Sequence, residues 1–426
     1  MEIIMNPVRN EWQKLCERNI PSDNDIQRAV EEIIENVRQN GDKALFEYAG
    51  RFDGFKGSSL ILSEQEINEA VKQVRPDVAH AIRKAAANIE KFHRAQLPVP
   101  VEVTTTPGVR CLQRAVAIDK VGLYIPGGRA PLFSTVLMLA IPARIAGCKE
   151  VILCTPENGT HGIAPEILFA AKLCGIHKIV RIGGAQAVAA MAFGTESIPA
   201  VHKIFGPGNR FVTKAKQLVS RITAIDMPAG PSEVMVMCDH TAKPSFVAAD
   251  MLSQAEHGPD SQAIAVCTSQ EIAEAVASEV ERLADTLPRR DSIEGSLSHS
   301  RIIIIPDVMD MVAFANEYAP EHLIISMAKP WDIAWRIKAA GSVFIGNYSP
   351  ESAGDYASGT NHTLPTSAWA RSFSGVNIDS FMHKITYQEL SPEGLAELGD
   401  VITTMAHAEG LDAHALAVDI RLNPNL

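Results

Sequence analysis

The 426-residue sequence lacks the patterns that mark several classes of protein. No Cys-x-x-Cys pair occurs among the seven cysteines, which stand at positions 16, 111, 148, 154, 174, 238 and 267. An odd, unpatterned set predicts reduced thiols in a cytoplasmic protein and argues against a Cys-rich structural zinc site. The longest apolar runs, such as Val136 to Ala143, are too short to span a bilayer, and the N-terminus does not resemble a signal peptide. We therefore expect no membrane partner.

Positive charge is also scarce. The 39 Lys and Arg residues are outnumbered by 50 Asp and Glu residues, which gives a net charge of −11. A nucleic-acid surface needs clustered Lys and Arg, so we expect no nucleic-acid partner. Hydrophobic residues make up 46% and charged residues 21%, as in an ordinary globular protein. The length is too great for one compact core, so two or more domains are expected.

The N-terminal quarter has helical patterns. Apolar residues recur at helical spacing over 25–39, and two further helices are expected over 64–74 and 76–96. Ser63 and Glu66 form a capping-box pattern ahead of the second helix. A β-rich run follows at 101–106, after the Pro98–Pro100 break.

From about residue 119, short apolar strands alternate with helices. Strands are expected at 121–125, 150–154, 178–182 and 203–205 and, after Ser232, at 233–238, 263–267, 301–305, 322–326 and 342–346. Such alternation predicts parallel sheets that are covered on both faces. We therefore expect an α/β protein with two Rossmann-like parallel-sheet domains and helical N-terminal and C-terminal segments. The expected division is an N-terminal segment over 1–20, a larger α/β domain that joins 21–120 to 232–375, a second α/β domain over 121–231 and a C-terminal helical segment over 376–426.

Glycine-rich turns end three of the expected strands. They are Gly127-Gly128, Gly183-Gly184 and Gly206-Pro-Gly208. Glycine there lets a phosphate or ribose approach the backbone and a helix N-terminus. None of the turns is a complete Gly-x-Gly-x-x-Gly, and ordinary tight turns remain an equal alternative.

Two pairs of polar residues could carry chemistry. Gln254 and His257 share one face of a helix if the helix extends through both, so they could ligate one metal ion or form a solvated helix end. Glu321 and His322 could supply two acid–base groups. Neighbours on a strand point to opposite faces, so both serve one site only if Pro320 redirects the chain. The alternative for this pair is a solvated strand edge.

The two remaining candidate segments lie nearer the C-terminus. A loop over 349–365 combines Asp355 and His362 with glycine and small polar residues, which is typical of a site but also of a structural loop. Asp355 offers a hard oxygen ligand. Glu409 and His414 flank Gly410, where they lie around a corner or in a helix connection with solvated charges.

Taken together, these stretches closely resemble the histidinol dehydrogenase family. The resemblance covers nearly the whole chain and rests on eight long motifs in order: 121–128 (VGLYIPGG), 183–186 (GGAQ), 205–209 (FGPGN), 226–233 (DMPAGPSE), 253–258 (SQAEHG), 318–322 (YAPEH), 352–362 (SAGDYASGTNH) and 408–414 (AEGLDAH). One departure is Ser367-Ala-Trp369, where relatives often have a more glycine-rich turn.

The resemblance implies a set of roles. One Zn²⁺ per subunit would be bound by Gln254, His257, Asp355 and His414. NAD would be contacted by Tyr124, Gln186 and Asn209, within the 121–231 domain. The substrate would be contacted by the zinc ligands and by Ser232, His322, His362 and Glu409. Glu321 and His322 would be the acid–base pair.

The resemblance also implies the reaction and the assembly. The family oxidises L-histidinol through L-histidinal to L-histidine with two NAD⁺, at the end of histidine biosynthesis. It forms a homodimer with shared active sites, in which segment 376–426 reaches the partner subunit. The alternatives are a zinc- and NAD-dependent relative acting on another alcohol, such as a sulfonated diol, a zinc hydrolase, and a non-catalytic metal-binding protein.

Overall fold

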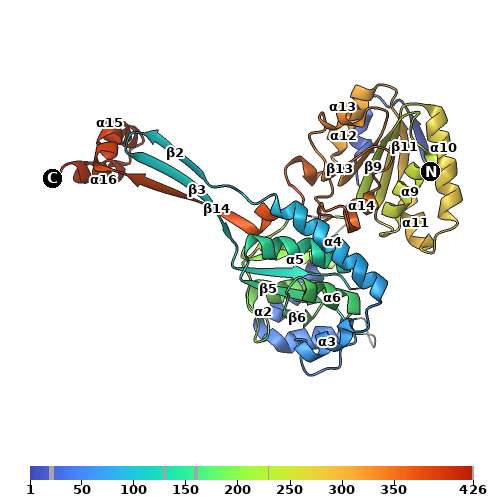
Figure 1. Cartoon of the computed structure of the whole chain (residues 1–426), viewed down its shortest axis with the longest axis horizontal. Coiled ribbons are helices and arrows are strands. Elements are labelled where there is room, and N and C mark those ends of the chain that lie inside the picture. Colours follow the sequence, from blue (N-terminus) through green and yellow to red (C-terminus); the bar gives the residue numbers. More distant parts are fainter. Residues whose placement is uncertain (19–23, 128–130, 158–161, 229, 425–426) are drawn as a thin grey trace.

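The computed structural model of the chain describes residues 1–18, 24–127, 131–157, 162–228 and 230–424. It contains two parallel sheets, each covered by helices, and a separate antiparallel sheet that forms an extended arm (Figure 1). The predicted α/β class with two parallel sheets is confirmed. None of the helices in the described ranges has the length and apolarity needed to cross a bilayer.

The first parallel sheet has five strands in the order β6-β5-β4-β7-β8. In chain order these are β4 (Lys120–Tyr124), β5 (Glu150–Thr155), β6 (Lys178–Arg181), β7 (Lys203–Phe205) and β8 (Ala224–Ile225). The helices between them are α5 (Phe133–Ala146), α6 (Pro165–Leu173), α7 (Gly184–Phe193) and α8 (Arg210–Val219). Val121 and Leu123 of β4 are fully buried because both faces of the sheet are covered.

The second parallel sheet has six strands in the order β1-β11-β10-β9-β12-β13. The strands are β1 (Glu2–Met5), β9 (Glu233–Cys238), β10 (Gln262–Cys267), β11 (Arg301–Ile304), β12 (His322–Ser326) and β13 (Ser342–Ile345). Its helices are α1 (Arg9–Leu15), α9 (Pro244–Ala255), α10 (Gln270–Ala284), α11 (Arg290–Leu297), α12 (Val308–Tyr318), α13 (Pro330–Ala334) and α14 (Glu351–Tyr356). Two short 3₁₀ helices follow, η2 (Trp369–Arg371) and η3 (Ile378–Phe381).

Three N-terminal helices pack on the five-stranded sheet. They are α2 (Asn24–Phe52), which is interrupted at Gly41, α3 (Glu64–Val71) and α4 (Pro76–Arg94). The predicted Ser63–Glu66 capping box opens α3. The expectation that residues 21–120 share a domain with 232–375 is wrong for these helices. Their apolar faces complete the core of the first sheet: Leu45 of α2 packs in one cluster with Val188 of α7, and Ile89 of α4 packs in another with Leu137 of α5.

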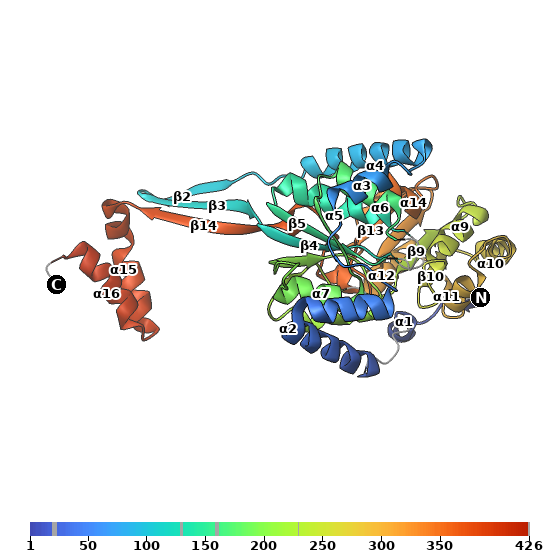
Figure 2. The same ribbon diagram turned by 90° about the horizontal axis from the view of Figure 1, so that it is seen from below.

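The arm consists of three antiparallel strands and a pair of helices. Strand β3 (Val109–Ala117) lies between β2 (Val101–Thr106) and β14 (Met382–Leu390), and the helices are α15 (Pro392–Ala408) and α16 (Asp412–Leu422). Figures 1 and 2 show the arm projecting away from the rest of the chain in both views. The C-terminal segment 376–426, expected to be helical, contains α15 and α16 but begins with η3 and strand β14. The residues of β14 are almost all exposed, so the strand has no alternation of apolar and polar residues to reveal it.

Candidate active site

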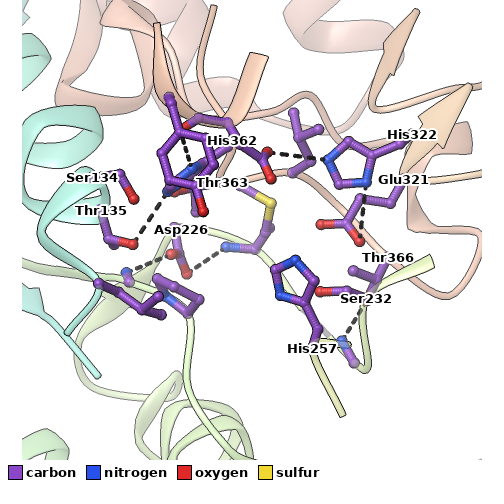
Figure 3. A pocket seen from close by; sticks show the side chains of 18 of the residues that line it. Ser134, Thr135, Asp226, Ser232, His257, Glu321, His322, His362, Thr363 and Thr366 are labelled. Carbon is purple, nitrogen blue, oxygen red and sulfur yellow. Dashed lines mark hydrogen bonds and ion pairs between the residues drawn. The ribbon is translucent and has the colours of Figure 1, made fainter. Parts of the chain in front are cut away.

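A cavity is lined by both parallel-sheet units (Figure 3). The unit of the five-stranded sheet contributes Ser134, Thr135, Lys216 and Asp226 among others. The unit of the six-stranded sheet contributes six residues that the sequence singled out, namely Ser232, His257, Glu321, His322, Asp355 and His362. Segments more than 100 residues apart in the chain therefore meet in one site.

His322 opens strand β12 and presents one ring nitrogen without a partner. Its Nδ1 lies 3.2 Å from the backbone oxygen of Glu233, and its buried Nε2 has no hydrogen-bond partner among the described residues. A carbonyl oxygen can only accept, so the ring proton belongs on Nδ1 and the lone pair on Nε2. Burial lowers the pKa of His322 to about 3, so the ring is neutral at physiological pH and able to accept a proton.

Glu321 is held beside His322 by the backbone of Glu233, which also contacts His322. Its Oε2 accepts the backbone N–H of Glu233 at 3.0 Å, and burial raises the pKa of the carboxyl well above its usual value. The preceding Ala319 has a φ of 52°, so the chain turns sharply after α12. Both side chains line the same cavity, so these neighbouring residues share one site. The alternative of a solvated strand edge is wrong, because Glu321 and His322 are 5% and 3% exposed.

Three of the four expected metal ligands, Gln254, His257 and Asp355, lie where α9 ends and on α14. Helix α9 ends at Ala255, so His257 lies just beyond it and does not share a helical face with Gln254 as the sequence had suggested. One ligand atom from each of His257, Glu351 and Asp355 lies within 4.8 Å of the other two. Burial raises the pKa of Asp355 to about 7, which shows that the negative charge lacks compensation there. An imidazole among oxygen donors fits a divalent cation such as zinc.

Glu351 is a residue that sequence reasoning missed. It is 1% exposed and stands four residues before Asp355 on α14. The spacing of four was a usable signal, because residues i and i+4 lie on the same face of a helix. The segment was expected to be a loop, which hid that relation.

His362 connects the two sheet units. Its Nδ1 lies 3.0 Å from the backbone oxygen of Asp355, and its Nε2 lies 3.2 Å from the hydroxyl of Thr135 on α5. The first contact places the ring proton on Nδ1, so Nε2 accepts from the Thr135 hydroxyl. Burial lowers the pKa of His362 to about 4. The neutral ring is thereby fixed at the boundary of the two units.

A buried ion pair, also unforeseen, lies on the opposite wall. Lys216 of α8 pairs with Asp226, and their side chains are 6% and 1% exposed. Asp226 also accepts the backbone N–H of Gly206 at 2.8 Å, and Lys216 donates to the Gly206 carbonyl at 2.9 Å. The pair fixes the Gly206 turn at the edge of the cavity.

Two of the expected NAD residues lie at the carboxyl end of the five-stranded sheet. Tyr124 ends β4, and its buried hydroxyl accepts the backbone N–H of Gly184 at 3.2 Å. Gln186 is 2% exposed on α7. A Cβ on Gly183 would lie 2.6 Å from Pro156, and Gly184 has a φ of +66°, so this turn needs glycine. The crevice beyond strand ends is where parallel sheets bind nucleotides, so the residues present fit a dinucleotide.

The third expected NAD residue has a structural task. Asn209 caps α8, and its side-chain oxygen accepts the backbone N–H groups of Phe211 and Val212 at 3.0 and 3.2 Å.

Asp53, which sequence reasoning missed, lies beside the Gly183 turn and accepts the backbone N–H of Gly183. Gly128, part of the first glycine-rich turn, lies outside the described residues.

Glu409 and His414 do not reach the cavity of their own chain. Glu409 caps α15 and His414 belongs to α16, and both are exposed on the arm. Gly410 between them has a φ of +72°, which makes the predicted corner. Figures 1 and 2 place these helices at the far end of the arm, away from β9 and α14.

Comparisons with known proteins agree with this architecture. The chain is 54% identical to a histidinol dehydrogenase of Bacteroides fragilis, over 99% of both chains. It is 52% identical to that of Salmonella typhimurium, over 95% of this chain and 93% of the relative. A crystal structure of histidinol dehydrogenase from Elizabethkingia anophelis matches with a TM-score of 0.97 at 48% identity, over 100% of this chain and 98% of the other.

More distant similarity concerns the fold alone. An acetylating aldehyde dehydrogenase from Geobacillus thermoglucosidasius has a TM-score of 0.50 at 13% identity, over 89% of this chain and 94% of the other. The sequence profile of histidinol dehydrogenase matches residues 16–422. The chain therefore belongs to the histidinol dehydrogenase family.

Proposed function

We propose that Glu321 and His322 carry the proton transfers of this enzyme. As a histidinol dehydrogenase, the protein is an NAD- and zinc-dependent oxidoreductase of histidine biosynthesis that oxidises L-histidinol through L-histidinal to L-histidine. The observation that carries the assignment is the buried, unpartnered Nε2 of His322, which lines the cavity beside Glu321. A neutral imidazole in that position is suited to accept the substrate hydroxyl proton.

The metal site we propose combines residues of two chains. Gln254, His257 and Asp355 of one subunit and His414 of the partner subunit would hold one Zn²⁺. When bound, zinc positions the substrate nitrogens and NAD⁺ accepts one hydride in each oxidation. Three of these ligands come from the α9–α14 region, where the buried carboxylates lack compensating charge.

The two oxidations use the acid–base pair in turn. In the first, His322 Nε2 takes the alcohol proton as hydride leaves the carbon, and the product is the aldehyde. In the second, Glu321 removes a proton from water as the water attacks the aldehyde, and His322 returns its proton to the aldehyde oxygen, which gives the hydrate. The neutral His322 then takes a hydroxyl proton of the hydrate as the second hydride leaves. The raised pKa of Glu321 makes its ionised form a stronger base for that step.

Further residues would orient substrate and cofactor. Ser232 and His362 line the cavity and would contact histidinol, together with Glu409 of the partner subunit. Tyr124 and Gln186 would contact NAD at the Gly183–Gly184 turn. Asn209 would contact NAD from its capping position at the start of α8.

The assembly we propose is a cytoplasmic homodimer with shared sites. The arm exposes large apolar side chains on strands and helices, among them Val103, Ile385, Val401, Met405 and Leu416. A second copy of the chain would bury these side chains and bring Glu409 and His414 to the other subunit's cavity. The seven cysteines are unpaired, as expected in a reducing compartment.

The stoichiometry of NADH formation tests the reaction. Purified protein is supplied with L-histidinol, NAD⁺ and Zn²⁺, and about two NADH per histidinol consumed are expected because each hydride reduces one NAD⁺. His322→Asn should lower kcat by about 100- to 10,000-fold, the usual contribution of a general base. Turnover of another alcohol but not of histidinol would contradict the proposal.

Mixing two inactive variants tests the shared site. Glu321→Ala and His414→Ala are each expected to be inactive. After subunit exchange at equal amounts, about one quarter of the parent activity should return, because half of the dimers are mixed and each of these has one complete site. No recovery despite confirmed exchange would show that both residues act within one chain.

A further inference from the structure

We propose that Glu351 is a positioning residue that orients the Gln254 amide, so that its oxygen and not its nitrogen is presented to the metal. The inference deepens the proposed metal site and rests on it. It concerns an amide whose two ends differ in chemistry: the oxygen can ligate a cation, whereas the NH₂ group can only donate hydrogen bonds.

Hydrogen bonding determines the orientation of this amide. Gln254 is fully buried, so its polar atoms need partners within the protein. The end of the amide that faces Glu351 lies 2.8 Å from one oxygen of that carboxyl group and 3.2 Å from the other. Beside a bound cation the Glu351 carboxyl group is ionised, and an amide oxygen there would face two acceptors, so the NH₂ group occupies this position. The Gln254 oxygen is then turned away from Glu351.

His322 does not compete for the same hydrogens. Its Nδ1 also lies 3.2 Å from the Gln254 nitrogen, but it carries the proton that is directed to the Glu233 backbone oxygen. Nδ1 of His322 is thus a donor, and it leaves the amide hydrogens of Gln254 to Glu351. One carboxyl group therefore sets the direction of the amide.

The position of Glu351 is itself fixed. Its side chain is 1% exposed, and its backbone N–H donates to the carboxyl group of Asp250, one turn before Gln254 on α9. Helices α9 and α14 are tied together at the level of the ligands. Asp355, one turn after Glu351, offers its carboxylate to the same cluster. A residue that holds a ligand in this way resembles the outer partners that orient ligands in many metal sites.

Measurement of Zn²⁺ affinity tests the inference without reliance on turnover. The full-length protein is freed of metal, and Zn²⁺ is titrated against a chromogenic chelator, with thermal unfolding as a check of folding. Glu351→Gln keeps the size of the side chain but offers an amide to an amide, and it should weaken Zn²⁺ binding about 10- to 100-fold. Glu274→Gln, the same change at an exposed position of α10, should bind like the parent.

An exchange of the two residues gives a sharper test. In the double variant Gln254→Glu/Glu351→Gln, the amide and carboxylate trade places, the net charge is kept and one carboxylate oxygen of residue 254 remains for the metal. On a log Kd scale, the exchange variant should recover at least half of the Zn²⁺ affinity that Glu351→Gln loses. A purely steric role of Glu351 would give no such recovery.

Three results would overturn the inference. The first is parent-like Zn²⁺ binding by Glu351→Gln, and the second is an exchange variant no better than that single variant. The third is a zinc-bound crystal structure with a Glu351 oxygen within about 2.2 Å of the metal, which would make Glu351 a ligand. Gln254→Ala separates this inference from the site itself: parent-like binding by that variant would refute both, whereas weakened binding with an unaffected Glu351→Gln would refute only the role of Glu351.

Discussion

At the scale of single residues, the backbone of Glu233 organises the acid–base pair. Its N–H holds Glu321 at 3.0 Å and its carbonyl oxygen receives the Nδ1 proton of His322 at 3.2 Å. The Glu233 side chain is fixed by Arg18, with contacts of 2.8 and 3.0 Å to its two oxygens. The Arg18 guanidinium also stacks on the ring of Tyr318 at 3.6 Å. The positions of both functional side chains thus depend on one buried ion pair.

We predict that Arg18→Gln destabilises the protein and lowers its activity. The Glu233 side chain is 1% exposed, so loss of its partner leaves a buried charge unpaired, at a cost of about 3–5 kcal/mol in unfolding free energy. Denaturant unfolding measures this change. The matched control is Arg9→Gln, whose ion pair with Asp310 is exposed and should contribute less than about 1 kcal/mol. Equal effects of the two substitutions would contradict the role given to Arg18.

A second prediction concerns Asp53 and pH. Burial raises the pKa of Asp53 from 3.8 to about 6, so the folded chain binds this proton more tightly than the unfolded chain does. Stability from this group is therefore present below pH 3.8 and is lost as pH rises through 6. Asp53→Asn removes the buried charge, so its melting temperature should exceed that of the parent at pH 8 and the difference should vanish near pH 4. A gain that is independent of pH would contradict this explanation.

At the scale of elements, burial decided what the sequence could reveal. Strands β4, β5 and β9 to β12 lie in sheets covered on both faces, so their apolar runs stand out between helices. Strands β3 and β14 belong to a sheet that is largely exposed, and apolar periodicity does not mark them. The site residues likewise fall into those that the sequence revealed and those that it did not. Residues in distinctive motifs were found by resemblance, whereas Lys216 and Asp53 act through contacts that no local pattern records. The i, i+4 relation of Glu351 to Asp355 was hidden because a loop was expected there.

The turn before η2 offers a prediction for an element. Ser367 and Ala368 have φ values of 54° and 62°, a conformation that costs non-glycine residues about 1–2 kcal/mol. Ala368→Gly removes this strain but adds freedom to the unfolded chain worth about 0.4–1 kcal/mol, so a net gain of up to roughly 1 kcal/mol is expected. Thermal unfolding checks it. Ala370→Gly, at a buried position within η2, should instead lower the melting temperature.

At the scale of the whole molecule, the chain consists of a body and an arm with different physical characters. In the body, each parallel sheet has its own core, and helices from the first quarter of the chain complete the core of the five-stranded sheet. Sequence order alone did not assign those helices, because an apolar helix face does not indicate which of the two sheets it packs against. The arm leaves its apolar side chains exposed, which is unfavourable in an isolated subunit and favours a partner.

The arm therefore supplies a prediction about assembly. Met405 on α15 and Leu416 on α16 are 60% and 51% exposed. If a second copy covers them, the double variant Met405→Glu/Leu416→Glu should shift the protein from dimer to monomer in light scattering. Histidinol oxidation should be lost with the dimer, because Glu409 and His414 would no longer reach the other subunit's cavity, while NAD binding by the body should persist. Trp335→Glu, at an 81% exposed apolar position of the body, should leave the dimer and its activity unchanged. A monomeric parent, or an arm variant that remains dimeric and active, would refute the proposed assembly.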